Sequence, residues 1–245
     1  MSEPATPRPA ATLLLLRDGP SGLEVLMVAR AREVDFAAGA LVVPGGRVEA
    51  EDAALAAPED PLGAFRVAAI RETFEECGVL LAEPGATAGA GAFGAALAAQ
   101  RLAPATRALA HFAHWITPRH SPKRYDTHFF LARAPEGQEA VQDGREAVEA
   151  VWVNPAAALA EAEAGRRTLV FPTRLNLRRL APMRSVAEAL AHAAAAPVVT
   201  VTPEPVTDAA GQVFLRIPEA AGYGGGLFPA RDRPAAGGRW PGEQG

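Results

Sequence analysis

Residues 71–79 read RETFEECGV, in which three glutamates stand at positions i, i+3 and i+4: Glu72, Glu75 and Glu76. At about 100° per residue, a helix would gather their carboxylates within an arc of about 100°. The apolar side chains would fall on the opposite side: Val67, Ile70, Phe74 and Cys77. The stretch therefore predicts an amphipathic helix, over about residues 64–81, that buries one face and crowds three like charges on the other.

Two interpretations of this acidic face are open. Like charges at helical spacing repel one another, so a bound cation would relieve the strain between them. A hard divalent cation prefers oxygen ligands and is the natural candidate. The alternative is a solvated acidic face on an ordinary surface helix, and an isolated ExxEE pattern alone favours that alternative.

The residues before the helix favour the cation. Residues 40–46 read ALVVPGG, an apolar run that indicates a strand entering a tight turn. Acidic residues follow the turn, and Asp52 is the last of them. The whole arrangement resembles the Nudix box, G-x5-E-x7-R-E-U-x-E-E-x-G-U, in which U is aliphatic. The matching positions are Gly46, Arg71, Glu72, Glu75, Glu76, Gly78 and Val79.

The chain departs from this pattern in three places. Thr73 stands where an aliphatic residue is usual, and Asp52 falls where the family has glutamate. Eighteen residues, 53–70, separate Asp52 from Arg71 where the family has seven. We interpret the eleven extra residues as an exposed loop inserted at about 53–63, because proline and glycine recur there.

A split box of this kind resembles the Nudix branch that includes the peroxisomal coenzyme A diphosphatases. Residues 26–46, LMVARAREVDFAAGALVVPGG, are similar to the stretch that precedes the box in coenzyme A hydrolysing members. Arg30 and Gly39 match that stretch, whereas Asp35 replaces an arginine and Val43 replaces a phenylalanine. The resemblance extends over about residues 11–195.

The resemblance implies an α+β fold, an α/β/α sandwich with a mixed sheet between helices. It also implies hydrolysis of a diphosphate by water, with Mg²⁺ or Mn²⁺ as cofactor. The implied metal ligands are Glu72, Glu75, Glu76 and the carbonyl of Gly46. Arg71 is expected to orient a glutamate, although pairing within its own helix is the plain alternative. Many relatives add an acidic residue from a loop, which acts as a further metal ligand or as the base. Glu146 and Glu149 are the candidates for this role, and we prefer Glu146.

Coenzyme A or an acyl derivative is the leading substrate, cut to phosphopantetheine and adenosine 3′,5′-bisphosphate. Arg30 and Gly39 would line the nucleotide end. A basic loop could clamp a phosphate or could simply be solvated: Arg119, Lys123 and Arg124. ADP-ribose or another nucleoside diphosphate derivative is the second choice of substrate. A non-catalytic Nudix ligand-sensing module is the alternative of another class, although all three box glutamates are present.

Composition sets broader bounds. With 245 residues, 49 % of them apolar, the chain can bury one substantial core. A net charge of −4 does not favour nucleic acid. Cys77 is the single cysteine, and with no signal-like segment this favours a cytoplasmic protein that does not enter membranes. The oligomeric state is not fixed by the sequence, and a homodimer is one form that it allows.

We expect three parts: a flexible tail at 1–9, the hydrolase domain at 10–196 and a C-terminal extension at 197–245 that lies over the domain or pairs with a partner chain. Four histidines stand close together in the sequence: His111, His114, His120 and His128. Residues three apart on a regular strand point to opposite faces, which argues against zinc binding by His111 and His114.

Overall fold

A mixed sheet of eight strands forms the centre of the fold. The computed structural model describes residues 5–30, 40–86, 91–142 and 147–230. The strands are β1 (Arg8–Gly19), β2 (Gly22–Arg30), β3 (Leu41–Val42), β4 (Gly45–Arg47), β7 (Ala110–Ile116), β8 (Tyr125–Arg133), β9 (Ala147–Val153) and β10 (Thr200–Val201). Their order is β10-β7-β8-β1-β2-β3, with β4 paired to β1 and β9 paired to β2. β1 runs parallel to β8 and antiparallel to β2, so the expected mixed sheet is confirmed.

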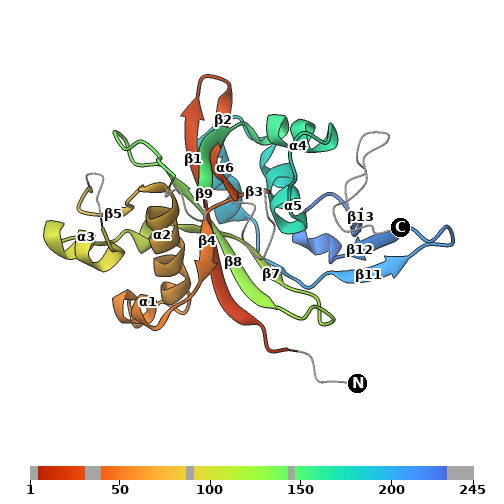
Figure 1. Ribbon diagram of the computed structural model, residues 1–245, viewed down its shortest axis with the longest axis horizontal. Coiled ribbons are helices and arrows are strands. Elements are labelled where there is room, and N and C mark those ends of the chain that lie inside the picture. The colour runs from red at the N-terminus through yellow and green to blue at the C-terminus, as the bar shows by residue number, and fades with distance from the viewer. Residues whose placement is uncertain (1–4, 31–39, 87–90, 143–146, 231–245) are drawn as a thin grey trace.

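Helices cover both faces of this sheet (Figure 1). They are α1 (Ala50–Leu55), α2 (Gly63–Cys77), α3 (Phe93–Gln100), α4 (Pro155–Glu163), α5 (Phe171–Leu180) and α6 (Val186–Ala195). One hydrophobic cluster joins the sheet to α2 and α3, and the other joins it to α4, α5 and α6. The expected α/β/α sandwich is therefore confirmed.

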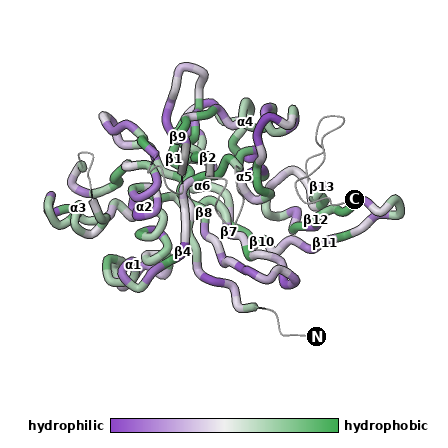
Figure 2. The backbone as a smooth tube through the Cα atoms, in the orientation of Figure 1, coloured by the Kyte–Doolittle hydropathy of each residue, from purple (hydrophilic) through white to green (hydrophobic). Residues whose placement is uncertain are grey.

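β1 is buried on both faces, which explains its continuous apolar run. Leu13 and Leu15 belong to the cluster under α2, whereas Leu14 and Leu16 belong to the cluster under α5. A central strand with helices on both sides needs apolar residues at every position. Figure 2 shows hydrophobic colour along the central strands and hydrophilic colour along many of the outer loops. β1 begins at Arg8, inside the segment that we expected to be a tail.

The ends of three helices correct or support the sequence interpretation. α2 ends at Cys77 rather than near residue 81, because Gly78 takes a left-handed conformation with φ 70°. Asn154 caps α4, since its side chain accepts from the backbone N–H groups at 156 and 157. α6 is capped by the Ser185 hydroxyl, which accepts from the backbone N–H of Glu188.

The segment beyond residue 200 packs against the domain. β11 (Glu204–Thr207), β12 (Val213–Arg216) and β13 (Leu227–Pro229) form a small antiparallel sheet beside α5 in Figure 1. A second small sheet pairs β5 (Ala82–Glu83) with β6 (Ala103–Pro104). The Tyr223 hydroxyl accepts from Trp115 Nε1 at 3.0 Å and donates to Asn176 Oδ1 at 2.8 Å. Burial raises the pKa of Tyr223 to about 12, so this hydroxyl stays protonated at neutral pH.

Among the described residues, none of the helices has both the length and the apolar composition that crossing a bilayer requires.

Candidate active site

α2 carries the three glutamates, and its expected apolar face is buried. Val67, Ile70 and Cys77 are fully enclosed, and Phe74 is 4 % exposed. The glutamates do not share one environment. Glu75 has 43 % of its side chain exposed and Glu72 has 18 %, whereas Glu76 is buried. The acidic face therefore does not point wholly outward, because α1 and β4 also pack against this helix.

Arg71 joins the glutamates to the rest of the fold. Its Nη1 donates to Glu72 Oε1 at 2.9 Å and to Glu75 Oε2 at 3.0 Å. Its Nε and Nη2 donate to the two carboxylate oxygens of Asp52, and Nη2 also reaches the carbonyl of Arg47. Burial acts to lower the pKa of Arg71, but Asp52 and Glu72 outweigh it and the pKa is raised. The guanidinium is thus a permanent cation.

Asp52 is the counterion that fixes Arg71, and the sequence showed only that it occupies a position of the split box. Its side chain is 1 % exposed, and its pairing with Arg71 is bidentate. Asp52 also accepts from the backbone N–H of Glu49, which starts α1 with a reciprocal capping arrangement. Paired, hydrogen-bonded carboxylates are the kind that can be buried whole.

The inserted residues are more ordered than we expected. Residues 53–55 continue α1, and turns follow as far as residue 62. Asp60 accepts from the backbone N–H of Leu62 and from Arg66 Nη1, which ties the insert to the first turn of α2. Thr73, the other departure from the pattern, is fully buried with its hydroxyl donating to the carbonyl of Ala69 at 2.8 Å. This bond explains how a hydroxyl is accommodated at an aliphatic position.

Gly46 lies directly against the carboxylate of Glu72. A methyl group at this position would collide with that carboxylate, and one at Gly45 would collide with the backbone of β1. Both residues lie on β4, which pairs with Ala11 and Thr12 of β1. The turn therefore needs glycine for close approach rather than for flexibility.

A pocket of about 510 Å³ opens beside these groups. Glu72, Glu75, Arg71 and Gly46 form one side of it. Residues of β1, the β7–β8 hairpin and the start of α5 form the other sides: Thr12, Thr117, Tyr125, Thr127, Phe129, Pro172 and Thr173. Tyr125, Thr127 and Phe129 alternate along one strand, so a period of two could have indicated this wall.

The basic loop divides into two kinds of residue. Arg119 and Lys123 are exposed between the two pocket-lining residues Thr117 and Tyr125. Arg124 is buried instead, and its guanidinium donates to the carbonyls of Thr117 and Ala5. These bonds hold the ends of the loop and the start of β1, so we assign Arg124 a structural role rather than phosphate binding.

The remaining candidates from the sequence are placed in part. Glu146 and Gly39 lie outside the described residues, as does the side chain of Arg30, whose backbone ends β2. Glu149 forms a bidentate ion pair with Arg167 and is not among the pocket residues. Because Glu76 is buried, Glu72 and Glu75 are the box glutamates that face the pocket.

The donor set at this pocket fits a hard divalent cation. Two carboxylates lie on one wall, and a backbone without a side chain approaches one of them closely. Oxygen-only donors of this kind suit Mg²⁺ and Mn²⁺. Arg71 contacts the same two carboxylates and holds them in place.

The histidines correct our argument against a shared face. The pairing of β7 with β8 shifts register between His111 and Ala113, which is a β-bulge. His111 and His114 consequently both lie against His128 of the neighbouring strand. The regular alternation that we assumed fails here because the bulge adds one residue.

Comparison with known proteins identifies the family. The NUDIX domain family model matches residues 6–171. A solved NUDIX hydrolase from Alicyclobacillus acidocaldarius is 30 % identical with a TM-score of 0.68, and the match covers 76 % of this chain and 96 % of that one. The chain therefore belongs to the Nudix family.

Two similar proteins are acyl-coenzyme A diphosphatases. The match to acyl-coenzyme A diphosphatase NUDT19 of Gallus gallus is 28 % identical and covers 69 % of this chain and 64 % of that protein. The match to its namesake in Homo sapiens is 31 % identical and covers 54 % of this chain and 42 % of that protein. The chain thus spans less than two thirds of the length of either relative.

Proposed function

We propose that this protein is a divalent-metal-dependent hydrolase that cleaves the diphosphate of coenzyme A or acyl-coenzyme A. Phosphopantetheine, or its acyl derivative, and adenosine 3′,5′-bisphosphate would be the products. One observation carries the proposal. Arg71, clamped by the buried Asp52, holds Glu72 and Glu75 at the wall of a pocket of about 510 Å³. Carboxylates held in this way can keep cations against an anionic substrate.

The box residues have distinct tasks in this proposal. Glu72 and Glu75, with the backbone of Gly46, would hold Mg²⁺ or Mn²⁺, which would neutralise diphosphate oxygens and lower the pKa of bound water. Arg71 keeps two of the carboxylates oriented at 2.9 and 3.0 Å without competing for substrate, because Asp52 occupies its other side. Glu146 stays our candidate for the base that accepts a proton from water.

The choice of coenzyme A rests on three supports. Two relatives are named acyl-coenzyme A diphosphatases. Residues 26–46 resemble the stretch that precedes the box in coenzyme A hydrolysing proteins. Arg119 and Lys123 lie exposed on the loop whose two ends line the pocket, where a 3′-phosphate could reach them.

A substrate panel tests the proposal. Coenzyme A, an acyl-coenzyme A, dephospho-coenzyme A and ADP-ribose are incubated with the full chain and Mg²⁺ or Mn²⁺, and the products are identified by mass. We expect adenosine 3′,5′-bisphosphate from the first two. Turnover of ADP-ribose without turnover of coenzyme A would contradict the coenzyme A proposal and favour ADP-ribose as the substrate. No turnover of any compound would favour a ligand-sensing module.

An arginine variant then tests how the substrate is read. Arg119→Ala should lower kcat/KM for coenzyme A by about 10- to 150-fold, the worth of one charged hydrogen bond of roughly 1.5–3 kcal/mol. Dephospho-coenzyme A lacks the 3′-phosphate, so its kcat/KM should be unaffected. Arg107→Ala, which alters another exposed arginine, is the matched control. Equal losses of kcat/KM on coenzyme A and dephospho-coenzyme A would show that Arg119 does not contact the 3′-phosphate.

A further inference from the structure

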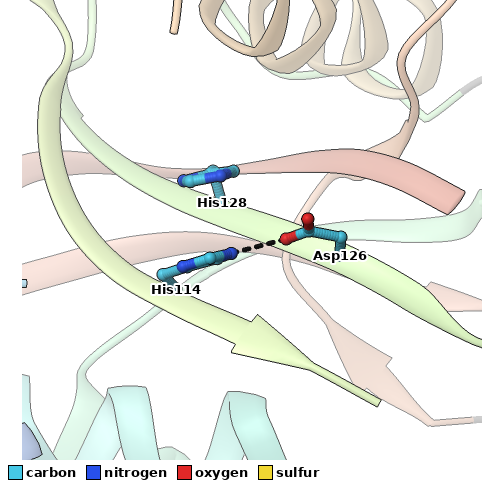
Figure 3. A group of neighbouring side chains, drawn as sticks. All are labelled: His114, Asp126 and His128. Carbon is cyan, nitrogen blue, oxygen red and sulfur yellow. Dashed lines mark hydrogen bonds and ion pairs between the residues drawn. The ribbon is translucent and has the colours of Figure 1, made fainter. Parts of the chain in front are cut away.

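A second polar cluster lies on the other face of the strand that lines the pocket. Tyr125, Thr127 and Phe129 of β8 face the pocket, so the alternate residues Asp126 and His128 face the side of the sheet that α2 covers. His114 stands directly opposite His128 on β7. Figure 3 shows the two imidazoles one above the other, with the carboxylate of Asp126 at the edge of the His114 ring.

The contacts within this cluster are short. The rings of His114 and His128 are parallel to within 8°, with centroids 4.0 Å apart. Asp126 Oδ1 lies 2.5 Å from His114 Nε2. One donor atom from each of the three residues lies within 4.8 Å of the others. Two imidazoles and one carboxylate therefore converge from two adjacent strands.

We propose that His114, Asp126 and His128 bind a transition-metal dication of the zinc type, at a site separate from the carboxylates of α2. Two nitrogen donors and one oxygen donor suit Zn²⁺, Co²⁺ or Ni²⁺ and do not suit Mg²⁺. This inference does not rest on the proposed function, because it concerns another face of the sheet and another class of ligand.

The hydrogen bonds around the two histidines leave the required lone pairs available. His114 Nδ1 lies 2.8 Å from Thr200 Oγ1, so in the tautomer with its N–H on Nδ1 it donates to the hydroxyl and leaves Nε2 as the ligand atom. His128 Nδ1 lies 3.0 Å from His111 Nε2 and can donate to it, which frees its own Nε2. Outer partners that fix the tautomer in this way are typical of metal-binding histidines.

The contact between His114 and Asp126 indicates where the cation belongs. In one tautomer His114 Nε2 carries the N–H and donates it to Asp126 Oδ1, and in the other the N–H lies on Nδ1 and Nε2 presents a lone pair. A dication bound between Nε2 and the carboxylate would select the second tautomer. Because the rings are stacked in parallel, binding requires them to rotate so that each donor comes to about 2.0–2.2 Å from the ion.

The surroundings allow an ion to enter. His114 has 17 % of its side chain exposed and Asp126 has 35 %, so one side of the cluster meets solvent. Arg66 of α2 is a cation near the neighbouring His111, and its Nη1 is paired with Asp60. Because the ligands come from β7 and β8, a bound ion would fasten together the two strands that carry the loop beside the pocket.

Direct binding measurements test this proposal without any assay of catalysis. The full chain is stripped with chelator and titrated with Co²⁺, followed by its d–d absorption, and with Zn²⁺, followed by calorimetry and thermal melting. We expect one ion per chain at this site, a visible Co²⁺ spectrum and a higher melting temperature with Zn²⁺. A large excess of Mg²⁺ should not displace either ion. No binding of Zn²⁺ or Co²⁺ would overturn the proposal.

Variants locate the ion. His114→Ala and Asp126→Asn should each weaken Zn²⁺ binding by at least about 100-fold, since each removes a ligand. His120→Ala, which removes an exposed histidine outside the cluster, and Glu75→Gln at the carboxylate site should bind as the wild type does. Both partly exposed ligand positions should fold, which circular dichroism checks. Unchanged Zn²⁺ affinity in His114→Ala and Asp126→Asn would place the ion elsewhere and overturn the assignment.

Discussion

The Arg71 cluster of α2 and the histidine cluster of β7 and β8 are built on opposite electrostatic plans. Around Arg71, a permanent cation is surrounded by carboxylates, and each charge has an opposite charge at hydrogen-bond distance. Around His128, the rings lie against one another, and burial lowers the pKa values of His111 and His128 to about 4, with further lowering from neighbouring His114. One cluster is thus held by full charges, whereas the other contains two imidazoles, His111 and His128, that are neutral at neutral pH.

This difference teaches how one small domain can offer two kinds of cation site. A set of ionised oxygens favours hard ions such as Mg²⁺ and Mn²⁺. Neutral imidazoles beside one carboxylate favour borderline ions such as Zn²⁺. The two sites should therefore respond to different changes, and a variant in one should leave the other intact.

We expect the largest effect on stability from a substitution of Asp52, the buried counterion of Arg71. Asp52→Asn keeps the shape but leaves the buried Arg71 without its bidentate counterion. Removing one partner of a buried ion pair costs about 3–5 kcal/mol. We therefore expect urea unfolding to show a loss of about 4 kcal/mol in the free energy of unfolding. Turnover should also fall, because Arg71 no longer holds Glu72 and Glu75 in place.

An exposed ion pair supplies the matched control. Glu161→Gln removes a partner of Arg166 on the surface, where solvent screens the charges, and it should leave stability without measurable change. Zn²⁺ binding at the histidine cluster should survive in folded Asp52→Asn protein. A stable Asp52→Asn variant with wild-type turnover would show that the Arg71 cluster does not depend on its buried charge.

The next effect separates catalysis from folding. Glu75 faces the pocket and is 43 % exposed, so Glu75→Gln should fold and melt as the wild type does. Loss of one metal-holding charge should lower kcat by about 10²-fold, which corresponds to about 2.7 kcal/mol of activation free energy. Glu163→Gln, an exposed glutamate of α4, is the control. Wild-type kcat for Glu75→Gln at saturating Mg²⁺ would remove Glu75 from the metal ligands.

The same contrast explains what the sequence could predict. The carboxylates of α2 lie within one helical turn, so spacing alone brought Glu72 and Glu75 together with Arg71. The strands and the mixed sheet followed from apolar runs and from the family pattern. The sequence showed that Asp52 occupies a position of the box. It did not show that Asp52 is buried, because that burial depends on how α1 packs against α2. The helical residues 53–55 at the start of the insert were missed because proline and glycine beyond residue 57 dominated the local pattern.

The histidine cluster was beyond reach for a different reason. His114 and His128 are fourteen positions apart, and only the strand register places them opposite each other. His111 joins them through a bulge, which no alternation rule indicates in advance. Contacts that depend on register between strands, rather than on spacing within one helix, need the folded structure.

The smallest effect concerns the acid response of the neutral cluster in metal-free protein. His111 and His128 have folded-state pKa values of about 4 against an ordinary 6.5, with His114, Arg66 and Asp126 as the charged neighbours. Between pH 6.5 and 4 the unfolded chain binds more protons than the folded one, so stability is lost as pH falls through this window. With chelator present, we expect the free energy of unfolding to decrease across this window, measured by urea titration at several pH values. His111→Asn removes one of the two groups and keeps an acceptor toward His128 Nδ1, so the decrease should become smaller. If the stability of His111→Asn depends on pH as steeply as that of the wild type, His111 is not held neutral by the fold. The proposed electrostatic difference from the Arg71 cluster would then be wrong.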